Sequence, residues 1–334
     1  MQLLRKILFP ISFIYALVVY IRNWLFDIQV LKSKSYKTPI VCVGNLSAGG
    51  TGKTPMVETI ISLFKENSRV AVLSRGYGRK SKGYILATKE SGVEELGDEP
   101  YQIWSKFPEI ALVVDANRQN GIENLEEKEN PNIIILDDGF QHRKVKAGFS
   151  ILLTAYDNLY SEDWYLPTGN LRDSKKEAKR ANIIVVTKCP KDLPLDSQKR
   201  IIEKLRINSN QKVLFTYIGY KDVLNEKSVS VSLDSLRNKD ITLVTGIANA
   251  APLVAYLEEK GISFSHLNYK DHHFFSESEI KFMQSKPYIL TTEKDYVRLK
   301  GKMKNLMYIR VEHCFFNDGG KIFEQDIKSY VADN

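Results

Sequence analysis

The sequence GNLSAGGTGKTP, residues 44–55, contains the residues of a phosphate-binding loop. Its glycines allow backbone N–H groups to wrap around phosphate oxygens, its lysine neutralises phosphate charge, and its threonine offers a hydroxyl group to magnesium. The strict spacing GxxxxGK[ST] also requires a glycine at position 47, where this chain has Ser47, so the match is imperfect. A buried-strand pattern precedes the loop, and a helical pattern with Pro55 early in it follows over residues 55–67. We therefore expect nucleotide phosphates to be bound by Gly49, Gly50, Thr51, Gly52, Lys53 and Thr54.

Short apolar runs alternate with helical stretches along most of the chain. Continuous Ile, Val and Leu runs of this kind are typical of parallel strands buried on both faces. They predict an α/β fold, a P-loop NTPase-like, mostly parallel sheet with helices on both faces. After a polar, turn-rich stretch at 220–240 the alternation resumes, which predicts a smaller C-terminal α/β lobe. The expected division is an N-terminal helix at 1–24, a P-loop domain at 25–219 and the smaller lobe at 220–334.

Single residues disfavour two related classes of P-loop protein. Membrane-associated partitioning ATPases carry a lysine directly before the paired glycines, where this chain has Ala48. GTPases read guanine with the pattern [NT]KxD after a late strand, but VVTKCP at 185–190 places Pro190 where the aspartate should be. ATP is therefore the expected nucleotide.

The stretch NIIILDDGFQH, residues 132–142, ends a predicted buried strand in two carboxylates, Asp137 and Asp138. Open α/β sheets bind ligands at the carboxyl ends of their strands, and carboxylates there hold magnesium directly or through water. A solvated turn is the alternative interpretation, because adjacent acids followed by glycine are common in turns.

Phosphoryl transfer to a hydroxyl group also needs a base near the nucleophile. ELGDEP, residues 95–100, offers Asp98 and Glu99 at the start of a predicted helix, where Asp98 is alternatively an N-cap. The run DHHFF places His272 and His273 after a predicted strand of the smaller lobe. An aspartate polarised by a histidine from the opposite lobe would form a base when the lobes close. Candidates for binding an anionic acceptor, with surface salt bridges as the alternative, are Arg75, Arg79, Arg118 and Arg172.

The segment ILFPISFIYALVVYI, residues 7–21, is too apolar for a solvated helix. At 15 residues it is shorter than the roughly 20 that a spanning helix needs. Arg5, Lys6, Arg22 and Trp24 flank it, so we expect a membrane-associated helix in the headgroup region. A buried core helix and a signal peptide are the alternatives, but no A-x-A cleavage pattern follows.

The distribution of charge indicates the kind of partner. The first forty residues carry a net charge of +5, out of +8 for the whole chain. A basic bias beside the most apolar segment favours an anionic membrane surface over nucleic acid. Three widely spaced cysteines without CxxC spacing predict neither disulfides nor a zinc site and fit the cytoplasm. We infer no obligate protein partner.

Taken together, these motifs resemble the bacterial tetraacyldisaccharide 4'-kinases, the lipid A 4'-kinases. The resemblance spans most of the chain. It implies transfer of the γ-phosphate of ATP, with Mg²⁺, to the 4'-hydroxyl of an acylated glucosamine disaccharide 1-phosphate embedded in the membrane. The implied location is the cytoplasmic face of the inner membrane of a Gram-negative cell. The motifs are VGNLSAGGTGKTP, LSRGYGR, GDEP, LDDGFQHR, LPTGNLR, VTKCP, TGIANAAP, DHHFF and TTEKDYVRL.

Carried over motif by motif, the resemblance implies a role for each site residue. It makes Lys53 the phosphate lysine and Thr54 a magnesium ligand. It makes Asp98 the base on the sugar hydroxyl and pairs it with His272 in preference to His273. It further implies metal-site carboxylates at Glu99 and Asp138, and substrate contacts at Arg75, Arg118, Arg172 and Asp137. Two departures are the stretch DANR, which contains Arg118 and is only loosely similar to the family's motif, and Asp173, which stands where a glutamate is usual.

Two other functions remain open at this point. A membrane-tethered nucleotide switch would need Lys53 but no base, and Ala48 and Pro190 argue against it. A soluble small-molecule kinase would use the apolar N-terminus as core. Deleting residues 1–24 would then destroy folding instead of membrane binding.

Overall fold

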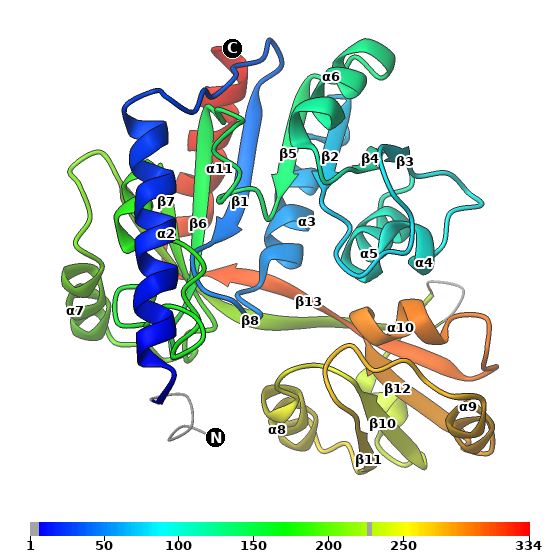
Figure 1. Cartoon of the computed structure of the whole chain (residues 1–334). Coiled ribbons are helices and arrows are strands. Elements are labelled where there is room, and N and C mark those ends of the chain that lie inside the picture. Colours follow the sequence, from blue (N-terminus) through cyan, green and yellow to red (C-terminus); the bar gives the residue numbers. More distant parts are fainter. Residues whose placement is uncertain (1–6, 226–228) are drawn as a thin grey trace.

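One continuous sheet runs through the computed structural model, which describes residues 7–225 and 229–334 (Figure 1). Within these residues it has 13 strands in the order β11-β10-β12-β13-β8-β7-β6-β1-β5-β2-β4-β3, with β9 paired to β8. Neighbouring strands are parallel except in the pairs β3–β4, β8–β9 and β8–β13. The predicted α/β class with a mostly parallel sheet is confirmed. The strands are β1 (Ile40–Asn45), β2 (Val70–Ser74), β3 (Ile85–Leu86), β4 (Ala111–Val114), β5 (Ile133–Asp137), β6 (Phe149–Ala155), β7 (Ile183–Thr187), β8 (Lys212–Asn225), β9 (Ser230–Val231), β10 (Ile241–Thr245), β11 (Phe264–Asn268), β12 (Tyr288–Thr292) and β13 (Leu306–Phe315).

Helices cover both faces of the sheet in each lobe. In the first lobe, apolar side chains of α3, α5 and α11 pack on one face, and those of α6 and α7 pack on the other. In the second lobe, α8 covers one face, and α9 and α10 cover the other. The continuous apolar strands require this arrangement, because both of their faces must be buried. The α-helices are α2 (Phe9–Asp27), α3 (Lys53–Phe64), α4 (Val93–Leu96), α5 (Asp98–Lys106), α6 (Arg118–Lys128), α7 (Leu195–Leu205), α8 (Ala251–Glu259), α9 (Glu277–Gln284), α10 (Glu293–Leu299) and α11 (Gly319–Ala332).

The long strands β8 and β13 connect the two lobes (Figure 1). Residues 212–215 of β8 pair with β7 of the first lobe, and residues 216–225 pair with β13. β13 in turn pairs with β12 of the second lobe through residues 306–309. The boundary predicted between residues 219 and 220 therefore falls inside β8, because this strand belongs to both lobes.

The C-terminal helix α11 returns to the first lobe, whereas the sequence prediction placed it in the smaller one. Phe323 and Ile327 are buried in the apolar cluster that contains α3 and β1. The Tyr330 hydroxyl also accepts a hydrogen bond from the Ile40 amide at 3.1 Å. Burial of the apolar side chains of Phe323 and Ile327 holds the C-terminus on the first lobe.

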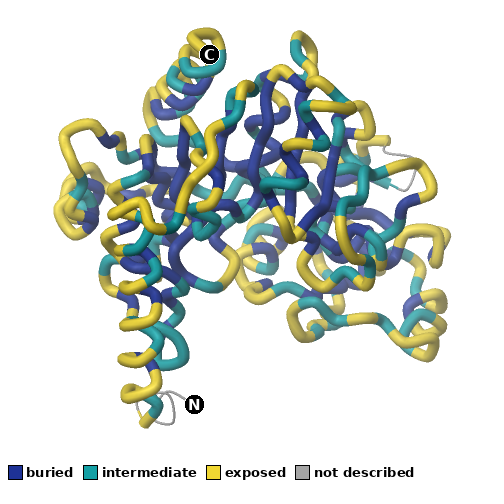
Figure 2. The backbone as a smooth tube through the Cα atoms, turned by 45° about the horizontal axis from the view of Figure 1, so that its top comes forward, coloured by how far each residue is buried: buried dark blue, intermediate teal, exposed yellow. Residues whose placement is uncertain are grey.

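The helix α2 turns its polar side chains toward the protein. Ser12 Oγ donates to Thr168 Oγ1 at 2.7 Å. Arg22 Nη2 and Asn23 Nδ2 donate to the fully buried Asp173 carboxylate at 2.8 and 2.7 Å. At 19 residues, α2 is the one helix of the described chain long and apolar enough to cross a membrane. Its outward face, seen largely exposed in Figure 2, carries exposed apolar side chains that include Phe9, Ile11, Phe13, Ile14, Leu17, Val18, Tyr20, Ile21 and Trp24.

A buried ionic cluster joins the lobes. Lys106 Nζ of α5 lies 2.5 Å from Glu58 Oε2 of α3 and 3.0 Å from Glu293 Oε1 of α10. Gln102 Nε2 donates to Glu58 Oε1 at 3.1 Å. Burial, together with the charge of Glu293, raises the pKa of Glu58 to about 7. One ammonium group is thus paired with two carboxylates. As a result, Glu58 gains or loses its proton in the neutral pH range.

Glu58→Gln is expected to make the free energy of unfolding less dependent on pH. Folded Glu58 retains a proton up to pH about 7, whereas the unfolded chain releases it near 4.5, so the wild type loses stability as the pH rises between these values. Relative to the wild type, the variant should gain on the order of 1–3 kcal/mol between pH 5 and pH 8. Denaturant unfolding in detergent, followed by circular dichroism, measures this difference.

The control for this prediction is Glu66→Gln, which changes an exposed glutamate just beyond the end of α3. It should leave the pH profile of stability unchanged. Parallel profiles for the wild type and Glu58→Gln would contradict the prediction.

Candidate active site

The loop between β1 and α3 has a backbone suited to phosphate. Gly49 and Gly52 have φ values of 118° and 85°, which residues with a side chain rarely adopt. A Cβ atom on Gly52 would lie 2.8 Å from Cε1 of His313, so no side chain fits there. α3 begins at Lys53, and its free N–H groups and dipole favour an anion at this end.

His313, on the inter-lobe strand β13, is hydrogen-bonded to this loop. Burial lowers the pKa of His313 to about 4, so its imidazole is neutral. His313 Nε2 lies 2.8 Å from the carbonyl oxygen of Gly52 and donates to it. Its Nδ1 then accepts from Thr216 Oγ1 at 3.0 Å. The phosphate loop is therefore hydrogen-bonded to the strand that connects the two lobes.

Two adjacent carboxylates at the end of β5 have different surroundings. Asp137 is 2% exposed, and its Oδ2 accepts from Ser74 Oγ at 2.8 Å. Burial and the nearby carboxylates of Glu99 and Asp138 raise the pKa of Asp137 to about 6. Burial would also raise the pKa of Asp138, but hydrogen bonds from Arg172 and the charge of Lys53 outweigh it and lower that pKa to about 2.

Arg172 and Lys53 both contact Asp138. Arg172 donates through Nη1 and Nη2 to the two carboxylate oxygens at 3.0 and 2.8 Å, a bidentate pair. Lys53 Nζ lies 3.7 Å from Asp138 Oδ1 and 3.4 Å from Asn45 Oδ1. The first lobe thus brings the predicted residues Lys53, Asp138 and Arg172 together at the carboxyl ends of the central strands β1 and β5.

Two of the predicted substrate-binding residues lie elsewhere than expected. Arg118 is 2% exposed and donates to the carbonyl oxygens of Asp115 and Asp137, the latter at 3.4 Å. It therefore lies behind the carboxylates and supports their backbone. Asp137 is equally buried, which places it out of direct reach of a large substrate. Arg75, which follows β2, is exposed.

The carboxylates at the end of β5 are suited to binding a magnesium ion. Asp137 Oδ1 is buried and has no hydrogen-bond partner among the described residues, which leaves an oxygen for a cation. No group of three or more His, Cys, Asp or Glu side chains in the described part of the chain is arranged to hold a metal. Mg²⁺ does not require one, because it takes one or two carboxylates and completes its shell with water and phosphate oxygens.

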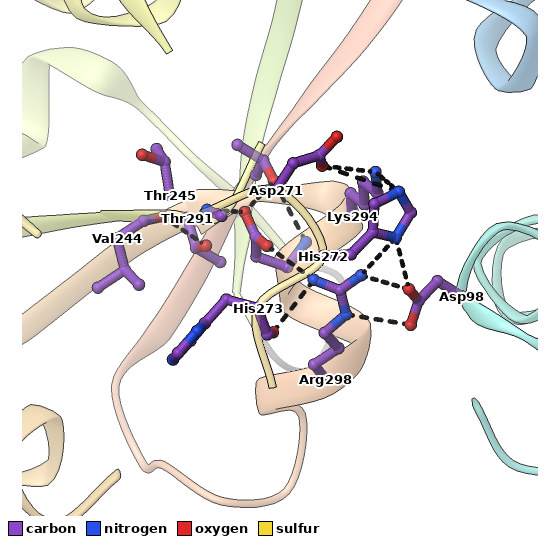
Figure 3. A network of polar contacts seen from close by, with 12 residues as sticks. Asp98, Val244, Thr245, Asp271, His272, His273, Thr291, Lys294 and Arg298 are labelled. Atoms are coloured by element: carbon purple, nitrogen blue, oxygen red, sulfur yellow. Dashed lines mark hydrogen bonds and ion pairs between the residues drawn. The ribbon is translucent and has the colours of Figure 1, made fainter. Parts of the chain in front are cut away.

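Asp98 and His272 meet at the interface between the lobes (Figure 3). Asp98 is the first residue of α5, and His272 lies in the loop after β11 with φ 59°. His272 Nδ1 is 3.1 Å from Asp98 Oδ2. Arg298 of α10 donates to the same carboxylate from Nε, at 3.0 Å, and from Nη2. Burial would raise the pKa of Asp98, but the hydrogen bonds from His272 and Arg298 hold it well below its usual range.

His273 has a different environment from its neighbour. Its Nε2 lies 3.0 Å from both carboxylate oxygens of Glu279, and its ring stacks on Tyr269 at 4.6 Å. The residues alone left open which histidine pairs with Asp98. In the structure His272 faces Asp98, whereas His273 packs within the second lobe.

Sequence reasoning assigned no role to several residues of this site. Arg298 and Lys294 belong to the stretch TTEKDYVRL, which was recognised only as a motif. Their spacing of four residues on a helix places both side chains on one face, and this signal was available in the sequence. The supporting contacts of His313, Ser74 and Asn45 had no such signal, because they depend on which strands become neighbours.

Comparisons with known proteins bear on the family of this chain. The model of the family described as Tetraacyldisaccharide-1-P 4'-kinase matches residues 4–331. A tetraacyldisaccharide 4'-kinase of Flavobacterium johnsoniae is 47% identical over 340 residues, covering 100% of this chain and 99% of the relative. One of Flavobacterium psychrophilum is 48% identical, covering 99% and 98%.

A solved structure is similar over the whole fold as well. The crystal structure of LpxK from Aquifex aeolicus in complex with ATP has a TM-score of 0.81 and 30% sequence identity, and the match covers 98% of this chain and 99% of that one. The family match, the near-complete relatives and the shared fold all lead to one conclusion: the chain belongs to the tetraacyldisaccharide-1-P 4'-kinase family.

Proposed function

We propose that this kinase transfers the γ-phosphate of ATP to the 4'-hydroxyl of tetraacyldisaccharide 1-phosphate, a precursor of lipid A. The observation that carries the proposal is the meeting of Asp98 and His272 across the lobes. The base candidate is one residue from Glu99, whose charge acts on Asp137 at the phosphate-binding edge. A nucleotide switch has no need for such a pair.

The first lobe supplies the nucleotide site. The backbone of the phosphate loop and the N-terminus of α3 would bind the β- and γ-phosphates, with Lys53 neutralising their charge. Thr54, Asp137, Asp138 and Glu99 would hold Mg²⁺, which when bound neutralises charge on the phosphates. Because Arg172 already engages Asp138, the buried Asp137 is the stronger candidate for a direct ligand.

Asp98 would accept the proton of the 4'-hydroxyl. Its lowered pKa makes it a weak base, but phosphoryl transfer passes through a loose transition state in which positioning matters more than base strength. His272 would orient the carboxylate. Arg172 and the exposed Arg75 would contact the transferred phosphate or the anionic acceptor.

Transfer of labelled phosphate from [γ-³²P]ATP to tetraacyldisaccharide 1-phosphate in detergent micelles tests this function. We expect labelled lipid with this acceptor and none with a lipid that already carries a 4'-phosphate. ATP hydrolysis without labelled lipid, stimulated by an added protein, would instead support the nucleotide switch.

We further propose that α2 lies in the cytoplasmic face of the inner membrane. Asp173 ties Arg22 and Asn23 of the helix to the protein, so the helix is docked along its polar side. The exposed apolar face is left for lipid, and the acyl chains of the substrate are too costly to extract from the bilayer at about 0.8 kcal/mol per methylene. The enzyme must therefore work at the membrane surface.

Replacing Phe13 and Val18 with serine should weaken binding to lipid vesicles at least tenfold, because their side chains are 65% and 60% exposed and each burial in lipid contributes roughly 1.5–3 kcal/mol. Flotation with anionic phospholipid vesicles measures this. The control is Phe282→Ser on α9 of the second lobe, where a 50% exposed phenylalanine is lost. Equal flotation of both variants would contradict the assignment.

A further inference from the structure

We propose that Lys294 and Arg298 of α10 are positioning residues for the Asp98–His272 pair, a proposal that rests on the kinase function above. Lys294 selects the tautomer of His272 that donates to Asp98. Arg298 fixes the plane of the Asp98 carboxylate. Figure 3 shows both side chains reaching the pair from the same helix.

The contacts of Lys294 determine which ring nitrogen carries the proton. Lys294 Nζ lies 3.0 Å from His272 Nε2 and 3.1 Å from Asp271 Oδ1, the distance of an ion pair. An ammonium group only donates, so Nε2 must be the unprotonated acceptor. Nδ1 then carries the hydrogen and donates to Asp98 Oδ2 at 3.1 Å.

The other protonation states conflict with these contacts. The Nε2–H tautomer would place a hydrogen against the Lys294 ammonium and a lone pair against the Asp98 carboxylate. The doubly protonated ring would also oppose the ammonium. Asp271 cannot substitute as a partner, because its Oδ1 is 3.8 Å from Nε2, too long for a hydrogen bond. Arg298 Nη2 also lies 3.2 Å from Nδ1, but it donates to Asp98 Oδ2 as well. Of the two neutral tautomers, only the Nδ1–H form gives the ring hydrogen an acceptor, Asp98 Oδ2, and leaves Nε2 free to accept from Lys294.

Arg298 holds the carboxylate by a two-pronged contact. Its side chain is 4% exposed, and its Nη1 is anchored by Asp295 Oδ1 at 3.4 Å and the His273 carbonyl oxygen at 3.3 Å. Nε and Nη2 donate to the two oxygens of Asp98. Among the described residues Oδ2 accepts from two groups and Oδ1 from one, so Oδ1 has more capacity left for the substrate proton.

The start of α10 is itself held rigidly. Thr292 caps the helix, with its Oγ1 accepting from the Asp295 amide at 3.2 Å. Asp295 is fully buried, and its Oδ2 accepts from the Gly246 amide at 2.9 Å. Lys294 and Arg298, four residues apart, project from this anchored turn on one face. A firmly placed helix is what a positioning role requires.

The test for Lys294 combines kinetics with the nitrogen NMR of the histidine ring. In enzyme labelled with [¹⁵N]histidine, with His272→Gln to assign the signal, we expect the wild type to show protonated Nδ1 and unprotonated Nε2. Lys294→Met should populate the Nε2–H form and lower kcat about 10–100-fold with little change in KM for ATP. Lys294→Arg, which also donates, should restore the tautomer. Lys300→Met, at the exposed end of α10, is the control expected to match the wild type.

The test for Arg298 is the split between kcat and KM. Arg298→Met removes the two-pronged contact, so the Asp98 carboxylate is no longer fixed, and kcat should fall about 10-fold or more with little change in KM for ATP. Arg298→Lys keeps the charge but not the two-pronged contact, so it should recover stability more than kcat. A loss of folded enzyme alone would show in thermal unfolding and would be reversed with the stability.

An unchanged His272 tautomer in Lys294→Met, with kcat equal to that of Lys300→Met, would overturn the role of Lys294. A kcat for folded Arg298→Met equal to that of the wild type, or full recovery of kcat in Arg298→Lys, would overturn that of Arg298. Absence of labelled lipid from the wild type would instead refute the kinase function, while the NMR result still shows whether Lys294 sets the tautomer.

Discussion

Asp98→Asn is expected to lower kcat for lipid phosphorylation by about 10²–10⁴-fold, the usual contribution of a general base. Asparagine keeps the size of the side chain but cannot take up the hydroxyl proton. KM for ATP should change little, because the phosphate loop lies between β1 and α3, which the substitution does not touch. Initial rates of labelled lipid formation at saturating ATP measure the effect.

A loss of folding must be separated from this loss of chemistry. Arg298 is 4% exposed and would keep a buried charge whose remaining ion pair is the longer one to Asp295, which costs up to about 3–5 kcal/mol. Asp98→Asn combined with Arg298→Gln removes both charges, so it should recover stability without recovering kcat. Stabilisation of each variant by ATP in thermal unfolding verifies that the nucleotide site is intact. A kcat within about threefold of the wild type would contradict the assignment of the base.

Lys53→Met is expected to lower kcat/KM for ATP by about 10³-fold or more. Lys53 is the cation at the N-terminus of α3, 14% exposed, and its Nζ faces Asp138 and Asn45. Charge-stabilising groups placed where transferred phosphate develops charge contribute 10²–10³-fold or more. Lys53→Arg should not rescue activity, because the planar guanidinium does not replace a compact ammonium.

The matched control for Lys53 is Lys65→Met. Lys65 stands at the C-cap of the same helix and pairs with Glu66 and Glu109 at the surface. Its loss should leave kcat/KM for ATP unchanged. Similar kinetics for the two methionine variants would mean that Lys53 does not act on the phosphates.

Local sequence was sufficient for the parts of the site that are contiguous in the chain. The phosphate loop lies between a strand and a helix, as the apolar run before it and the helical pattern after it predict. Asp137 and Asp138 stand at the end of a buried strand for the same reason. In these cases the backbone conformation that places the residues depends on their immediate neighbours.

The sequence contained less information about site residues whose role depends on how deeply their side chains are buried. Arg118 follows a strand, as a ligand-binding arginine would, yet it is buried and binds backbone carbonyl oxygens. Asp137 and Asp138 are adjacent in sequence, but one faces Ser74 and the other faces Arg172 and Lys53. Asp137 is the last residue of β5, whereas Asp138 follows the strand with a left-handed φ of 49°, so the two side chains leave the backbone differently and what each one meets depends on the rest of the fold.

By itself, the sequence determined the α/β class, the phosphate loop, the apolar helix near the N-terminus and the kinase family, because these depend on local pattern and motif. Only the tertiary structure decided that α2 docks by its polar side, that β8 belongs to both lobes, and that Lys294 and Arg298 reach the Asp98–His272 pair. Asp98 and Arg298 are 200 residues apart. Contacts over such separations form when the apolar faces of both lobes are buried, and no local pattern records which polar side chains are then brought together.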